Sequence, residues 1–92
     1  MNPDSIPLVS VIIPTFNHAN FLEKAIESVI NQTYGNLEAI VVDNHSTDET
    51  YQVIDKFKDS RIQYFKISND GIIAKSRNLG INVAKGEWIA FL

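Results

Sequence analysis

The regular alternation of strand-like and helix-like segments is the feature that most constrains how this chain can fold. Four apolar runs, at residues 8–13, 37–43, 61–67 and 87–92, are separated by segments whose apolar residues recur at helical spacing. Strand, helix and strand joined by short connections favour right-handed crossovers, which place parallel strands in one sheet with helices on both faces. We therefore predict an α/β fold, a three-layer sandwich with a parallel, Rossmann-like sheet.

The character of each run indicates where its strand lies in the sheet. Residues 8–13 (LVSVII) form a β-branched run typical of a buried strand, whereas residues 61–67 alternate only weakly and are predicted at an edge. A strand order of 3-2-1-4 places a switch point between the first and fourth strands. Ligands of such sheets bind beyond the carboxyl ends of the strands at this point.

The predicted helices carry signals of their own at their starts and on one face. Asn20 begins a capping-box pattern for the first helix, and residues 46–49 have the same pattern for the second. In the third helix Ile73, Ser76 and Gly80 share one side. Because Ser76 and Gly80 are small, we expect this helix to lie close to the sheet.

Length and composition exclude several classes of protein. The 92 residues suffice for one small domain. A net charge of −3 argues against a nucleic-acid partner, because phosphate binding needs a basic surface. The chain has no cysteine, so it forms neither a disulfide nor a zinc–thiolate site, which fits a reducing compartment.

The turn after the first strand lacks the glycines of the common nucleotide-binding turns. The segment 14–20 has no glycine, which excludes NAD or ATP sites of the dinucleotide-fold and P-loop designs. Pro14, Thr15 and Phe16 offer instead a stiff turn with an aromatic ring. Such a ring can stack on a base, which is worth about 1–3 kcal/mol in nucleic-acid complexes. The alternative is that Pro14 ends the strand and Phe16 covers the core.

Polar residues follow the second strand and open the third helix. The Asp43 carboxylate can accept hydrogen bonds from ribose or a base, and the Asn44 amide can read a base edge, although both also suit a simple turn. His45 is interpreted as an exposed turn residue. Lys75 and Arg77, at a helix N-terminus, can bind a diphosphate, with ordinary surface charge as the alternative.

Five motifs occur in order and at fitting spacing: VSVIIPTFN at 9–17, SVINQTY at 28–34, VVDNHSTD at 41–48, KSRNLG at 75–80 and GEWIAFL at 86–92. Each is weakly specific alone, and together they are strong. The chain resembles the family-2 glycosyltransferases of the GT-A fold from residue 8 to residue 92. The resemblance implies transfer of a sugar, with inversion, from a nucleoside-diphosphate sugar to a glycan or lipid-linked acceptor, in glycan or cell-surface polysaccharide synthesis.

The resemblance also implies which residues bind the nucleotide sugar: Pro14, Thr15, Phe16, Asp43, Asn44, Lys75 and Arg77. The first three would line the nucleoside pocket, the next two would contact base or ribose, and the two cations would lie toward the diphosphate. Asn44 stands where the family commonly has a second aspartate. Because a neutral amide changes the base-edge pattern, uridine is in doubt as the nucleoside and thymidine or guanosine donors remain open.

The family's Asp-x-Asp motif, which binds Mn²⁺ or Mg²⁺, would follow directly after Leu92, and the acceptor site and catalytic base lie later. The resemblance therefore predicts a single incomplete domain over residues 1–92, without catalytic or metal-binding residues of its own. Alone, this chain is expected to be inactive and to self-associate. The full-length protein is expected in the cytoplasm, including the inner face of the membrane. The alternative function is a non-catalytic nucleotide-binding or regulatory α/β module.

Overall fold

A computed structural model of the chain describes residues 6–92, so the first five residues of the predicted domain lie outside the description. Strands and helices alternate in this stretch as the sequence predicts. Their bounds are β1 Val9–Thr15, α1 Ala19–Ile30, β2 Leu37–Asp43, α2 Thr50–Lys56, β3 Ile62–Lys66, α3 Ile73–Val83 and β4 Trp88–Phe91.

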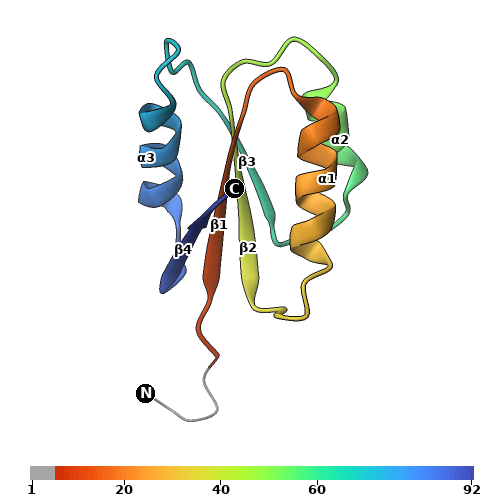
Figure 1. Cartoon of the computed structure of the whole chain (residues 1–92), viewed down its shortest axis with the longest axis vertical. Coiled ribbons are helices and arrows are strands. Elements are labelled where there is room, and N and C mark those ends of the chain that lie inside the picture. The colour runs from red at the N-terminus through yellow and green to blue at the C-terminus, as the bar shows by residue number, and fades with distance from the viewer. Residues whose placement is uncertain (1–5) are drawn as a thin grey trace.

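The four strands form one parallel sheet in the order β3-β2-β1-β4. Helices α1 and α2 cover one face and α3 covers the other, which gives three layers (Figure 1). The predicted α/β sandwich, the strand order and the edge position of β3 are therefore confirmed. None of the helices within residues 6–92 is long and apolar enough to cross a membrane.

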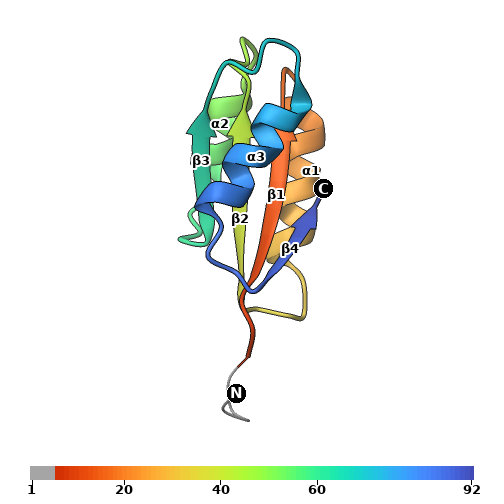
Figure 2. The ribbon, with the colours of Figure 1, turned by 90° about the vertical axis from the view of Figure 1, so that its left-hand side faces the viewer.

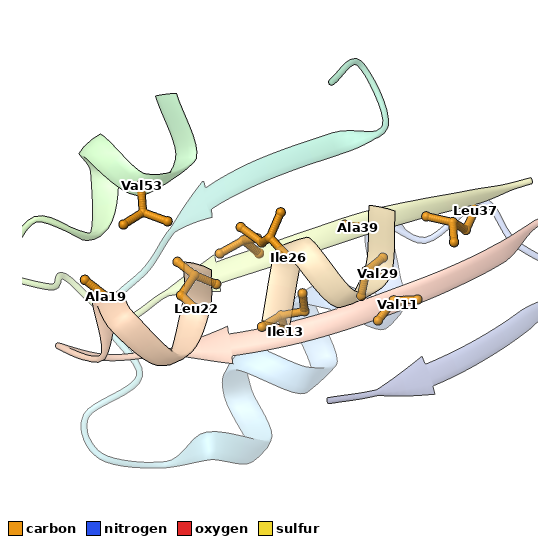
Figure 3. Close-up of a cluster of buried hydrophobic side chains, with 10 residues drawn as sticks. Val11, Ile13, Ala19, Leu22, Ile26, Val29, Leu37, Ala39 and Val53 are labelled. Atoms are coloured by element: carbon orange, nitrogen blue, oxygen red, sulfur yellow. The ribbon is translucent and has the colours of Figure 1, made fainter. Parts of the chain in front are cut away.

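The main hydrophobic core lies between the sheet and α1. Leu22, Ile26 and Val29 point from α1 onto Val11 and Ile13 of β1, as Figure 3 shows. These five side chains recur at helical spacing in α1 and at every second position in β1, so each element presents one apolar face. All seven residues of β2 are buried, because this strand has a neighbour on each side and helices on both faces.

On the opposite face, α3 lies across β1 and β2 at close range (Figure 2). A Cβ atom added to Gly80 would be 2.5 Å from Ile12 Cγ2, closer than such atoms come in proteins. Ser76, one turn earlier, is 1% exposed. The predicted close packing of these small residues is confirmed. Ile73 was predicted on the same inner side and is 53% exposed, because α3 begins at this residue beside an open cavity.

Both predicted capping boxes are wrong. Helix α1 begins at Ala19, so Asn20 lies inside its first turn, and the N–H of Ala19 donates instead to Asp48 Oδ2 at 3.1 Å. Helix α2 begins at Thr50, whose N–H donates to Asp48 Oδ1 at 3.1 Å. Ser46 donates hydrogen bonds to Asp43 at the end of β2 and does not cap α2. The N–H groups that begin the two helices therefore donate to Asp48, in the loop after β2.

At the amino-terminal end of the sheet, a buried carboxylate ties three strands to the turn before β4. Glu38 is 6% exposed and accepts hydrogen bonds from Ser10 Oγ at 2.6 Å, Gln63 Nε2 at 2.5 Å and Lys85 N–H at 2.7 Å. Burial alone would raise the pKa of Glu38. The hydrogen bonds from Lys85, Ser10 and Gln63 together outweigh that effect, so the pKa lies below its usual value.

Candidate functional site

A cavity of about 210 Å³ lies at the carboxyl-terminal edge of the sheet, between the end of β1 and the start of α3. Its lining residues come from these two elements and from the turn before α3: Pro14, Thr15, Phe16, Asn69, Ile73 and Ser76. β1 has β2 on one side and β4 on the other. The cavity therefore lies beside the predicted switch point, where the order of the strands in the sheet reverses.

Thr15 and Phe16 give the β1 side of the cavity unusual properties. Phe16 is 56% exposed, so its interpretation as a cover for the core is wrong. Thr15 is 9% exposed, and its Oγ1 is buried without a hydrogen-bond partner among the described residues. A buried hydroxyl without a hydrogen-bond partner is destabilising, and such groups are rare in folded proteins.

Asp43 ends β2 and is held by groups of the protein itself. Asp43 is 1% exposed, and its carboxylate accepts hydrogen bonds from Ser46 N–H at 3.0 Å, Ser46 Oγ at 2.5 Å and Tyr64 Oη at 2.5 Å. Burial, and then the bond to Asp43, raise the pKa of Tyr64 well above its usual value, so this hydroxyl stays protonated and donates. The predicted contact of Asp43 with base or ribose stays a prediction. The observed contacts make it an anchor for the loop after β2.

Asn44 and Asn69 join the loop after β2 to the turn before α3. Asn44 Oδ1 accepts a hydrogen bond from Asn69 N–H at 2.9 Å. Asn69 is 5% exposed, donates from Nδ2 to Ser76 Oγ at 2.9 Å and accepts from Gly71 N–H at 2.8 Å. The sequence predicts only a chain break at residues 68–71, so the structural role of Asn69 was missed. An asparagine two residues before a glycine indicates a turn and nothing more specific.

Asn17 joins the loop after β1 to the loop after β2, which sequence reasoning also missed. Its N–H donates to Ser46 Oγ at 2.8 Å, and its Oδ1 accepts from Thr47 N–H at 2.6 Å. The backbone of Asn17 has a φ of 48°. Asparagine is among the few residues other than glycine that adopt this left-handed conformation readily, which is the one local signal for its position.

Lys75 and Arg77 have different partners. Lys75 Nζ lies 3.1 Å from Asp70 Oδ2 in an exposed ion pair, which contributes little to stability. The Arg77 guanidinium lies 5.9 Å from the centroid of the Phe91 ring, near the end of β4. Arg77 therefore lies toward the end of β4 that adjoins the switch point, and Lys75 lies toward the turn before α3. Their role at a diphosphate stays a prediction.

The described residues do not fit a divalent cation. Residues 6–92 bring together no group of three or more His, Cys, Asp or Glu side chains that could hold a metal ion. At the carboxyl edge, Asp43 and Asp48 already accept hydrogen bonds from Ser46, Tyr64, Ala19 and Thr50. No step of the chemistry is therefore assigned to a metal on these residues.

Sequence comparison decides the family. The model of the family described as glycosyl transferase family 2 matches residues 10–92. The chain belongs to glycosyl transferase family 2. It is 44% identical to a UDP-Glc:alpha-D-GlcNAc-diphosphoundecaprenol beta-1,3-glucosyltransferase, WfaP of Escherichia coli, over 92% of this chain and 34% of that protein. The family-2 chain thus spans about a third of the length of this relative.

Solved structures show the same fold in this family-2 chain. S. aureus TarS 1-349, in complex with UDP-GlcNAc, superposes with a TM-score of 0.84 at 31% identity, over 91% of this chain and 25% of TarS 1-349. The mannosyltransferase PcManGT from Pyrobaculum calidifontis, in complex with GDP-Man and Mn²⁺, has a TM-score of 0.81 at 29% identity, over 95% and 27% of the two chains. The GT-A-like fold expected from the resemblance is confirmed.

Proposed function

We propose that this chain is the nucleotide-sugar-binding N-terminal part of a longer, inverting glycosyltransferase. One observation carries the proposal. At the carboxyl edge of a family-2 sheet, the exposed Phe16 lines a cavity together with Pro14 and Thr15. An exposed aromatic face beside a cavity gives a flat base a surface on which to stack.

In this proposal each predicted residue has a place along the donor. Phe16 stacks on the base, next to Pro14 and Thr15. Asp43 and Asn44 lie at the adjoining strand end. The diphosphate extends toward the N-terminus of α3, where Arg77 and Lys75 add positive charge; Figure 2 shows this helix in front of the sheet.

The acceptor, the bound cation and the cellular location are proposed for the full-length protein. The E. coli relative acts on a sugar linked to diphosphoundecaprenol, which supports a lipid-linked glycan acceptor and a place at the inner face of the membrane. The complex of PcManGT contains Mn²⁺ with GDP-Man, which supports Mn²⁺ or Mg²⁺ as the cofactor, held by residues outside 6–92. The cation would offset negative charge on the leaving diphosphate.

The test measures nucleotide affinity of the full-length protein by titration calorimetry with UDP and with GDP. Phe16→Ala is expected to lower the affinity for the preferred nucleotide about tenfold or more, because it removes a stacking surface. Phe21→Ala is the matched control, since Phe21 is 53% exposed on α1 and stacks on His18 instead.

Equal affinities for the wild type and Phe16→Ala would place the nucleoside elsewhere. Tight nucleotide binding by a full-length protein that transfers no sugar, in the presence of Mn²⁺ and lipid-linked acceptors, would favour the non-catalytic module instead.

We also propose that the isolated 92-residue chain self-associates through β4. This strand pairs with β1 at the end of the sheet, and Trp88, Ile89 and Phe91 are 66%, 41% and 49% exposed. Beside β4, a mostly apolar cavity of about 310 Å³ is lined by residues of β1, α1, β2 and β4, by the loop after α1 and by Leu92. An apolar edge strand favours association with another copy.

Sedimentation velocity across a dilution series tests this proposal. The wild-type chain is expected to form dimers or larger species that dissociate on dilution, and Trp88→Lys to remain monomeric, because a charge on an edge strand opposes pairing. Tyr51→Lys, at an equally exposed aromatic residue of α2, is the control and is expected to associate as the wild type does. A monomeric wild type at every concentration contradicts the proposal.

A further inference from the structure

The loops after β1 and β2 leave the sheet side by side. β1 and β2 are paired in parallel up to their last residues, Thr15 and Asp43. The N–H of Asn44 then donates to the carbonyl oxygen of Thr15 at 3.0 Å, which carries the pairing into the loops. The loop after β1 contains Phe16, the ring assigned above to the base. Whatever fixes the two loops to each other therefore also fixes where that ring is presented.

Reciprocal hydrogen bonds through Asn17 join the two loops. The Asn17 N–H donates to Ser46 Oγ, while Asn17 Oδ1 accepts from the N–H groups of Thr47 at 2.6 Å and Asp48 at 3.3 Å. Ser46 is fixed in turn by the buried Asp43 carboxylate. A continuous series of hydrogen bonds thus runs from the core of the sheet to the residue next to Phe16.

Packing alone does not explain the orientation of Phe16. Phe16 is 56% exposed, so more than half of its surface is free of contact with residues 6–92. The backbone direction at Phe16 is set instead by its neighbours. On one side Thr15 is held in β1, and on the other Asn17 is held in the left-handed region with its amide engaged. A side chain in this setting is ordered by the loop and not by the core.

We propose that Asn17 is a positioning residue for nucleotide binding, whose side-chain carbonyl holds the loop after β1 against the loop after β2 and so presents Phe16 in the orientation that stacks on a base. This inference rests on the proposed function. A ring held in place before the ligand arrives loses less conformational entropy on binding, so the affinity is higher than with a free loop.

Three substitutions separate the parts of this role. Asn17→Gly keeps the left-handed backbone without strain and removes the acceptor, whereas Asn17→Asp keeps an acceptor oxygen and tolerates the same φ. Asn31→Gly, at an exposed position that ends α1, is the matched control. Titration of the full-length proteins with UDP or GDP is expected to show a loss of about tenfold for Asn17→Gly, with near wild-type affinity for the other two.

A double-mutant cycle with Phe16→Ala distinguishes positioning from a general structural effect. If Asn17 acts through Phe16, the double variant Phe16→Ala/Asn17→Gly binds no more weakly than Phe16→Ala alone, because the ring to be positioned is already gone. Should Asn17→Gly fail to fold, Ser46→Ala replaces it in the cycle, since it removes the acceptor of the Asn17 N–H from the other loop. The same non-additive result is expected.

The outcomes separate this inference from the proposed function. Wild-type affinity in Asn17→Gly, losses that add in the double variant, or no recovery in Asn17→Asp each overturn the positioning role while leaving the Phe16 site intact. If Phe16→Ala itself has no effect on affinity, the proposed nucleoside site fails, and the positioning role fails with it.

Discussion

Replacing Gly86 with alanine is expected to lower the free energy of unfolding by about 3 kcal/mol, as for a severely overpacked site. The added Cβ would lie 2.7 Å from the carbonyl oxygen of Leu8 and 2.7 Å from the nitrogen of Ser10, both backbone atoms of the chain entering or forming β1. These atoms are fixed by pairing, since the Glu87 N–H donates to the same carbonyl at 2.9 Å. Relief of the contact requires β4 to move off β1.

Urea unfolding measures this effect, and Gly35→Ala is the control. A Cβ on Gly35 meets no atom within 4 Å, so its substitution is expected to change stability by no more than about 0.5 kcal/mol. Similar losses for the two variants would show that the close approach at Gly86 is not what stabilises the pairing of β4 with β1.

Glu38→Ala is expected to destabilise the chain by a similar amount, about 3 kcal/mol, because it leaves the buried hydroxyl of Ser10 and the partly buried donors of Gln63 and Lys85 without their acceptor. Glu38→Gln keeps the size of the side chain and one acceptor oxygen. Its amide NH₂ group faces one of the existing donors, so some stability is lost. Because one acceptor oxygen remains, we expect this loss to be smaller than for Glu38→Ala. Urea unfolding of both variants at neutral pH measures the difference.

The stabilisation by Glu38 is expected to depend on pH in a defined direction. Its pKa in the folded chain lies below the usual value of 4.5, so the unfolded state binds a proton more readily. The contribution of the carboxylate is therefore fully present above pH 4.5 and is lost as the pH falls through the folded value. The stability gap between wild type and Glu38→Gln should narrow over this range, and a gap that stays constant with pH would contradict the assignment.

The sequence predicts the sheet well because the burial of each strand is reflected in the residue pattern of that strand itself. An uninterrupted apolar run such as residues 37–43 is suitable only for a strand covered on both faces, and the weak alternation at 61–67 suits an edge. The capping boxes failed for the opposite reason. Asn20 has the right residue type near a helix start, yet the acceptor that Ala19 uses comes from another loop, and no local pattern identifies it.

The residues of the candidate site also differ in whether the sequence predicts them. Pro14, Thr15 and Phe16 could be predicted because they follow a strand directly, so their place at the carboxyl edge depends on that strand alone. Asn69 and Tyr64 could not be, because each acts through contacts with residues at the end of β2 that exist only once the sheet has formed. Residue type and spacing thus predict which residues line the cavity better than which residues support them.

The shared use of Asp48 has a consequence for how the chain assembles during synthesis. The Asp48 carboxylate accepts hydrogen bonds from the first N–H of α1 and from the first N–H of α2. Asp48 lies 29 residues after Ala19 in the chain. When Ala19 emerges from the ribosome, Asp48 is still 29 residues behind it in the chain. The hydrogen bond at the start of α1 therefore forms only after β2 and the loop that follows it have emerged, and one carboxylate then serves the starts of both helices.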